Sequence, residues 1–175
     1  MHIPRVYDSL ETYMRPGKVL VLSGPRQVGK TTLVRAVLER LEGRSLYVTG
    51  DDVRAQEAWS SMRLDVLTEL VEGYDTVVID EAQRIPDIGI SLKLLVDAGA
   101  PARLIVTGSS SFQLAGRTGE PLTGRKVSLL MLPVAQLEMR SLSNRAELRA
   151  GLESFLIYGS YPEVVSAESD GEKRA

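Results

Sequence analysis

The chain has 175 residues, of which 43% are hydrophobic, and this is long enough for one domain with a sizeable core. It contains no cysteine and a single histidine near the N-terminus, which excludes disulfides, thiolate metal sites and histidine-based catalytic or metal clusters. A net charge of −2 with scattered basic residues gives no support for nucleic-acid binding by this chain itself.

The first segment, residues 1–18, carries charged residues throughout and lacks the continuous apolar stretch of a signal peptide. Nowhere does an apolar run approach the length of a membrane span. Together with the absence of cysteine, these features predict a cytoplasmic protein that has no membrane partner.

The segment 24–31 fits the pattern G-x-x-x-x-G-K-[ST] of a phosphate-binding loop. It follows an apolar run, 19–22, that predicts a buried parallel strand, and it precedes a helix expected over 32–38. Glycines let successive backbone N–H groups point into one concavity, and the helix N-terminus adds the positive end of its dipole. This strand–loop–helix context separates a phosphate-binding loop from the alternative, a glycine-rich turn that happens to precede a lysine.

The loop therefore predicts a site for a nucleoside triphosphate. Lys30 would reach the β- and γ-phosphates, and the Thr31 hydroxyl would ligate Mg²⁺. The residues expected to bind the nucleotide are Gly24, Pro25, Arg26, Gln27, Val28, Gly29, Lys30, Thr31 and Thr32.

Strands and helices alternate along the rest of the chain. Trp59 is expected to be partly buried on the helical region around 64–71 rather than to stack on a ligand. Another helix is expected over 90–96. The stretch 134–158 is also expected to be helical, with Asn144 a break or a cap. Further strands are expected at 45–49, 76–79, 103–107 and 127–131. The alternation predicts a doubly wound α/β fold with its ligand chemistry at the carboxyl ends of the strands.

Asp80 and Glu81 end the third expected strand, where they would face the phosphate-binding loop. Asp80 suits the Mg²⁺ shell, usually through water, because Mg²⁺ keeps several waters and takes few carboxylates. The backbone can turn at a strand end, and Glu81 could then orient and partly deprotonate a water in line with the γ-phosphate. The alternative is an ordinary acidic strand end, but beside a phosphate loop the pair indicates a hydrolytic site.

Two further positions are candidates for catalysis. Ser109, followed by Ser110 and Ser111, comes after the fourth strand, and a hydroxyl there could sense the nucleotide state; serines at such places also serve as turn or cap residues. Arg125 comes just before the fifth strand and could stabilise charge on the transferred phosphoryl group, in cis or across a subunit contact. The alternative for Arg125 is a solvated basic loop.

The acidic pair also distinguishes an enzyme that hydrolyses the triphosphate from a small-molecule kinase. A small-molecule kinase delivers the phosphoryl group to an acceptor and has no need of a water-activating glutamate. The sequence contains no N-K-x-D pattern of the kind that a guanine-specific pocket commonly uses. These features favour adenine as the base and water as the acceptor.

Taken together, the motifs resemble the AAA-type P-loop ATPases of prokaryotes that often carry a DUF4143 domain downstream, the AAA_14 group. The matching stretches run in family order and are 24–33, 78–84, 107–111, 120–126 and 158–164. The resemblance implies a P-loop NTPase fold of the AAA-like kind, a three-layer α/β sandwich with a mainly parallel five-stranded sheet, and it implies ATP and Mg²⁺ as ligands.

The resemblance also implies roles for single residues. Lys30 and Thr31 would be the phosphate-loop pair, Thr31 and Asp80 would hold the metal, and the catalytic residues would be Glu81, Lys30, Arg125 and Ser109, with Ser110 an alternative sensor. The stretch 161–163, Tyr-Pro-Glu, matches a family signature for which a structural turn is the default explanation.

Residues 1–165 are expected to form the AAA-like ATP-binding domain and 166–175 a charged, disordered tail. Members of the group usually continue past the position of Val165 into another domain, so we expect a shortened protein or a fragment. The function expected is Mg-dependent ATP hydrolysis that drives an unidentified protein or nucleic-acid client, in a possible homo-oligomer. The alternatives are a nucleotide-dependent binding switch with negligible turnover, because the effector domain is missing, and a small-molecule phosphotransferase.

Overall fold

A computed structural model, which describes residues 3–109, 121–167, 169 and 171–174, shows a sheet of five strands that all run parallel. The strand order is β2-β3-β4-β1-β5. The strands are β1 (Val19–Ser23), β2 (Ser45–Thr49), β3 (Thr76–Asp80), β4 (Arg103–Gly108) and β5 (Lys126–Leu130). Each lies within one residue of the range predicted from the sequence, and the predicted parallel α/β sheet is confirmed.

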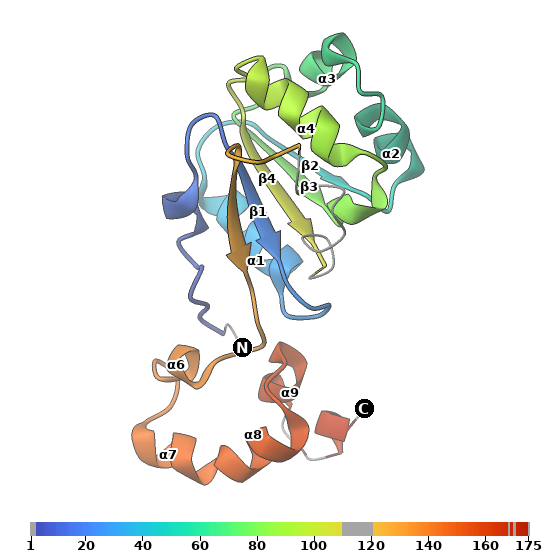
Figure 1. Ribbon diagram of the computed structural model, residues 1–175. Coiled ribbons are helices and arrows are strands. Elements are labelled where there is room, and N and C mark those ends of the chain that lie inside the picture. The colour runs from blue at the N-terminus through green and yellow to red at the C-terminus, as the bar shows by residue number, and fades with distance from the viewer. Residues whose placement is uncertain (1–2, 110–120, 168, 170, 175) are drawn as a thin grey trace.

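Helices cover both faces of the sheet and make three layers (Figure 1). One face packs against α1 (Lys30–Arg40) and the short 3₁₀ helix η1 (Leu10–Tyr13). The other packs against α2 (Val53–Trp59), α3 (Leu64–Val71) and α4 (Ile88–Asp97). The 3₁₀ helix η2 (Ala82–Arg84) continues directly from β3 and Glu81.

The two faces carry separate hydrophobic cores because side chains alternate along each strand. In β3, Val77 and Ile79 join the core under α2, α3 and α4, whereas Val78 joins the core under α1. All five residues of β3 are buried, as a parallel strand covered on both sides requires. This explains why the sequence shows a continuous apolar run rather than a polar–apolar alternation.

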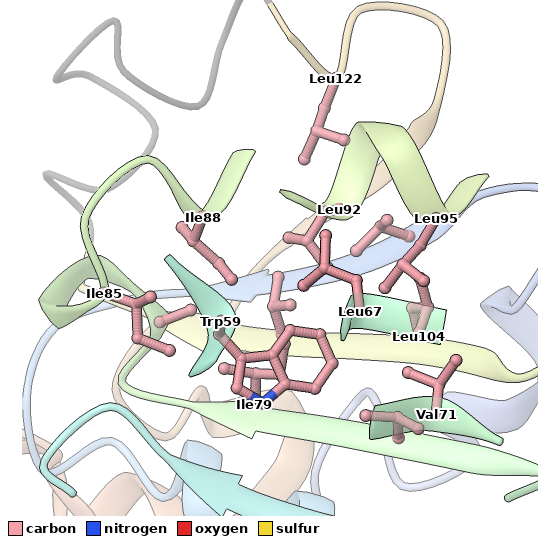
Figure 2. Close-up of a cluster of buried hydrophobic side chains, with 14 of the residues drawn as sticks. Trp59, Leu67, Val71, Ile79, Ile85, Ile88, Leu92, Leu95, Leu104 and Leu122 are labelled. Carbon is pink, nitrogen blue, oxygen red and sulfur yellow. The ribbon is translucent and has the colours of Figure 1, made fainter. Parts of the chain in front are cut away.

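Trp59 is buried to 1% exposure, more completely than the partial burial that the sequence suggested. It ends its own helix, α2, and its ring lies among Ile79, Leu67 and neighbouring aliphatic side chains (Figure 2). The structure buries it fully because α3 and α4 complete the layer over this face of the sheet.

The last helices lie beyond the carboxyl ends of the strands (Figure 1). Asn144 is a cap, as predicted: its side chain accepts hydrogen bonds from the amides of Ala146 and Glu147. The predicted helical stretch 134–158 contains α6 (Gln136–Met139), α7 (Arg145–Ala150) and α8 (Leu152–Tyr158), with Asn144 before α7 and Gly151 between α7 and α8. It is followed by α9 (Pro162–Ser166) and η3 (Glu172–Arg174). Among the described residues, no helix combines the length and the apolar character needed to cross a bilayer.

We expect Leu92→Ala to lower the free energy of unfolding by about 2–5 kcal/mol, because Leu92 is fully buried in the core and its truncation leaves a cavity. Leu156→Ala is the matched control, since Leu156 is 78% exposed, and it should change stability by no more than about 0.5 kcal/mol. Urea unfolding of both variants measures the difference, and equal losses would contradict this description of the core.

Candidate functional site

The predicted phosphate-binding loop joins β1 to α1 and is held at its start by both neighbouring strands. The Gly24 amide donates to the Gly108 carbonyl at the end of β4 (3.2 Å), and the Met131 amide after β5 donates to the Ser23 carbonyl (2.7 Å). A Cβ on Gly24 would lie 2.1 Å from the Met131 carbonyl oxygen, so the close approach of these strands requires glycine. Gly29 has φ 94° and immediately precedes α1, which lets the loop turn into the helix.

Lys30 begins α1, and its ammonium folds back into the loop. Its Nζ donates to the carbonyls of Gly24 (3.0 Å) and Pro25 (2.6 Å), and the residue is 5% exposed. Burial lowers the pKa of Lys30, and the nearby Glu81 and Asp80 carboxylates raise it without offsetting the burial. The loop, the ammonium and both acidic residues therefore lie at one place in the fold.

The Asp80 carboxylate at the end of β3 accepts hydrogen bonds from hydroxyls of three other elements. Oδ2 accepts from Thr31 Oγ1 on α1 (2.8 Å) and from the Tyr47 hydroxyl on β2 (2.5 Å). Oδ1 accepts from Thr107 Oγ1 on β4, a side chain with no exposed surface. Burial, followed by the hydrogen bond to Asp80, raises the pKa of Tyr47 to about 12, so its phenol remains a donor at neutral pH.

Glu81 is turned out of the strand direction by its backbone. It adopts a left-handed conformation, φ 50° and ψ 39°, which is uncommon for a residue other than glycine. Its amide donates to Thr107 Oγ1 (3.1 Å), and its Oε2 accepts a hydrogen bond from Gln83 Nε2. The backbone therefore turns at the end of this strand, a possibility that the sequence left open.

Ser109 lies at the same edge of the sheet, directly after β4, and its amide donates to Gln83 Oε1 (3.3 Å). The structure thus places Ser109 next to the acidic pair, whereas Ser110, the alternative sensor, lies outside the described residues.

Arg125 is not brought to this site. It precedes β5 at the amino-terminal edge of the sheet, where its carbonyl accepts from the Val19 amide (2.8 Å), while the loop follows the carboxyl end of β1. The five residues of β1 separate these edges by roughly 15 Å. Its guanidinium instead pairs with Asp97 at the end of α4, with Nε 2.5 Å from Oδ1 and Nη2 3.2 Å from Oδ2. In this structure Arg125 does not reach the loop of its own chain, and its catalytic role, in cis or across a subunit contact, stays a prediction.

Arg5 ties the loop to the C-terminal helices. Its guanidinium donates to the carbonyls of Val28 in the loop (2.5 Å) and Leu132 after β5 (2.6 Å), and to Glu138 Oε1 on α6 (3.1 Å). Burial by itself would raise the pKa of Glu138, but hydrogen bonds from the Ala135 and Val6 amides and from Arg5 lower it overall. The charged pair is almost fully covered, so it holds these segments in one arrangement.

A cavity of about 290 Å³ opens beside the loop between α1, the N-terminal segment and α9. It begins at Gly29 and Thr32 and contains both apolar and charged side chains. Pro162 and Glu163 of the Tyr-Pro-Glu signature are part of its wall, which assigns this signature a place that the sequence did not reveal. The remaining wall residues are Ile3, Arg5, Asp8, Leu33, Ala36, Arg40 and Ser166.

A larger cavity of about 550 Å³ lies at the opposite, amino-terminal edge of β1 and β4, lined by Lys18, Arg103 and neighbouring residues. It touches neither the loop nor the acidic pair. None of the predicted phosphate-binding residues lines it.

Sequence reasoning missed three side chains of the site: Tyr47, Thr107 and Gln83. Thr107 carried a usable signal, since it is a polar residue at the buried end of an otherwise aliphatic strand. Gln83 lies in the stretch 78–84 that carries the family resemblance, but no pattern in the sequence indicated its contact with Glu81. Tyr47 carried no signal, because tyrosine is common in strands.

Comparisons with known proteins agree with this geometry. Residues 16–140 match the family AAA_14, described as an AAA domain. The chain is 35% identical over 159 residues to the uncharacterized proteins Mb2031c of Mycobacterium bovis and Rv2008c of Mycobacterium tuberculosis, covering 90% of this chain and 33% of each relative. It therefore spans about a third of the length of these relatives.

Among solved structures, the chain resembles the Walker-type ATPase PABY2304 of Pyrococcus abyssi. The TM-score is 0.58 at 18% sequence identity, and the match covers 99% of this chain and 70% of that chain. At this identity the likeness shows a shared fold.

We expect Gly24→Ala to lower the unfolding temperature and to abolish binding of a nucleoside triphosphate, because the new Cβ collides with backbone that cannot move without parting β1 from β5. Gly17→Ala is the control: Gly17 also has a positive φ, 66°, but open space around it. The control should lose about 1–2 kcal/mol of stability and keep nucleotide binding. Thermal unfolding and titration with a fluorescent ATP analogue measure both, and binding retained in Gly24→Ala would refute the loop geometry.

Proposed function

The chain belongs to the AAA_14 family of AAA domains, and we propose that it binds ATP with Mg²⁺ and hydrolyses it to ADP and phosphate. The observation that carries the proposal is the hydrogen bond from Thr31 to Asp80, 2.8 Å, beside the Lys30 ammonium. It brings the last residue of the phosphate loop next to Asp80 at the end of β3. In a metal-dependent triphosphate site, a hydroxyl and a carboxylate placed in this way would hold the metal ion.

The loop supplies the attraction for phosphate. The amides before α1 and the helix N-terminus offer positive partial charge, and Lys30 adds a full one. In this structure the Lys30 ammonium donates hydrogen bonds to two neutral carbonyls. Phosphate oxygens are stronger acceptors for a cation, so triphosphate would draw the ammonium away from them.

The donor set fits Mg²⁺ and not a softer metal. Thr31 and Asp80 offer a hydroxyl and a carboxylate, both hard oxygen ligands. In the described part of the chain, no three histidine, cysteine or acidic side chains are grouped to hold an ion by themselves. This matches a metal whose shell is completed by phosphate oxygens and water, and which would neutralise charge on the triphosphate.

Glu81 is suited to activate water. Its carboxylate lies beside the loop, and its orientation is fixed by the backbone turn and by Gln83. In the proposed reaction a water oxygen bonds to the γ-phosphorus, the bond from that phosphorus to the bridging oxygen breaks, and Glu81 accepts a proton from the water.

The cavity of about 290 Å³ is the place that we assign to the nucleoside. It starts at Gly29 and Thr32, where the loop passes into α1, so a nucleotide with its phosphates in the loop can extend its base over Ala36. Its mixture of apolar walls and polar edges suits a planar base with a ribose. We propose adenine as the base, because the sequence contains no N-K-x-D pattern for guanine.

The work done by hydrolysis belongs to the whole protein and is a further proposal. We propose that the nucleotide cycle drives a protein or nucleic-acid client from a homo-oligomer in which Arg125 serves a neighbouring subunit. The second candidate, a binding switch with negligible turnover, is favoured by the engagement of Arg125 with Asp97 away from its own loop. The two candidates share the nucleotide site and differ in turnover.

We expect Glu81→Gln to bind ATP as the wild type does and to release phosphate about 10²–10⁴-fold more slowly, because the amide cannot accept the proton.

We expect Lys30→Ala to lose triphosphate binding, because the loop then lacks its full positive charge. Phosphate release and ATP titration, with and without Mg²⁺, measure these effects. If wild type and Glu81→Gln both stay at background while ATP binds, the switch is the function; unchanged affinity in Lys30→Ala would refute the site.

We expect Ala36→Phe to weaken ATP binding at least about tenfold, because the ring occupies the space assigned to the base. Inorganic triphosphate, which has no base, should bind this variant and the wild type equally well. Leu156→Ala, distant on α8 and exposed, is the control. Equal weakening of both ligands would show that the substitution damages the loop and would contradict the placement of the base.

A further inference from the structure

Gln83 makes two directed hydrogen bonds with a single side-chain amide. Its Nε2 donates to Glu81 Oε2, and its Oε1 accepts from the Ser109 amide (3.3 Å). Gln83 lies on η2, a short turn that follows Glu81, whereas Ser109 follows β4. The amide therefore joins the end of β3 to the end of the neighbouring strand.

The orientation of this amide is determined by its partners. Glu81 offers carboxylate oxygens, which only accept, and the Ser109 backbone N–H only donates. With the amide reversed, an oxygen would face a carboxylate and an NH₂ group would face an N–H, so both contacts would become repulsive. Of the isosteric residues, glutamate keeps the acceptor for Ser109 but loses the donor, and methionine loses both.

Among the described residues, Gln83 is the hydrogen-bond donor to the Glu81 carboxylate. The left-handed backbone and the bond from its amide to Thr107 fix where the side chain starts. The nearby Lys30 ammonium is hydrogen-bonded to the loop carbonyls, and the Asp80 carboxylate accepts hydrogen bonds from hydroxyls. Arg84, next to Gln83, turns away and pairs with Asp51 at 2.7 Å.

We propose that Gln83 is a positioning residue that orients the Glu81 carboxylate toward the attacking water. Through the same side-chain amide, it connects the orientation of Glu81 to the position of Ser109 at the end of β4. The inference rests on the proposed hydrolysis. A general base is commonly oriented by a further group, and a misplacement of about 1 Å can cost about 10²-fold in rate. Binding of the nucleotide does not use Gln83, since the loop and Lys30 provide it.

The test compares Gln83→Met, Gln83→Glu and the matched control Arg84→Met in the whole chain. Both Gln83 variants should bind ATP within about threefold of the wild type and hydrolyse it at least about tenfold more slowly in a single turnover, because only the transition state is affected. Arg84→Met removes an exposed ion pair on the same turn and should keep both properties.

Amide hydrogen exchange at Ser109 in the nucleotide-free protein gives a readout that does not depend on activity. The exchange should speed up in Gln83→Met, which has lost the acceptor, and stay slow in Gln83→Glu, which keeps it. Equal exchange in wild type and Gln83→Met would overturn the link to β4.

Combining the variants with Glu81→Gln separates this inference from the proposed function. If Gln83 acts through Glu81, adding Gln83→Met to Glu81→Gln causes no further loss of rate. A further loss, or a full rate in Gln83→Met alone, would refute the role of Gln83 while leaving the hydrolysis proposal standing. If Glu81→Gln itself hydrolyses ATP at the wild-type rate, the proposed function fails first.

Discussion

The structure of the site depends on the carboxylate of Asp80. Hydroxyls from α1, β2 and β4 donate to it, and each of these elements is thereby fixed relative to the end of β3. A carboxylate offers about four acceptor positions, so several donors can be satisfied at once without a paired cation. In the proposed function, the negative charge of this carboxylate would attract Mg²⁺.

The strand order explains how this carboxylate reaches the loop. β4 lies between β3 and β1, so the Thr107 hydroxyl at its carboxyl end can contact Asp80 on one side while Gly108 accepts from Gly24 on the other. The crevice outside the carboxyl ends of parallel strands is where ligands bind in open α/β sheets. Here Thr107 also accepts from the Glu81 amide, so one side chain holds both acidic residues.

The segments at the two ends of the described chain together complete the cavity beside the loop. Arg5 contacts the loop, the residues after β5 and α6, and Pro162 and Glu163 of α9 close the wall opposite α1. These contacts cover long separations in sequence. They connect the loop to α6 and α9 through Arg5 and the wall of this cavity.

The sequence by itself determined the five strands and predicted the candidate site beside them, because these signals are local. A buried parallel strand is written as an apolar run, and the loop residues together with Asp80 and Glu81 stand beside such runs. The tertiary structure decided what depends on contacts between distant segments. It brought Tyr47, Thr107 and Gln83 to the acidic pair, buried Trp59 completely, and placed Pro162 against the loop. It also set Arg125 at the far edge of the sheet, because a residue before a parallel strand and a loop after its neighbour lie at opposite ends of the sheet, whatever their motifs suggest.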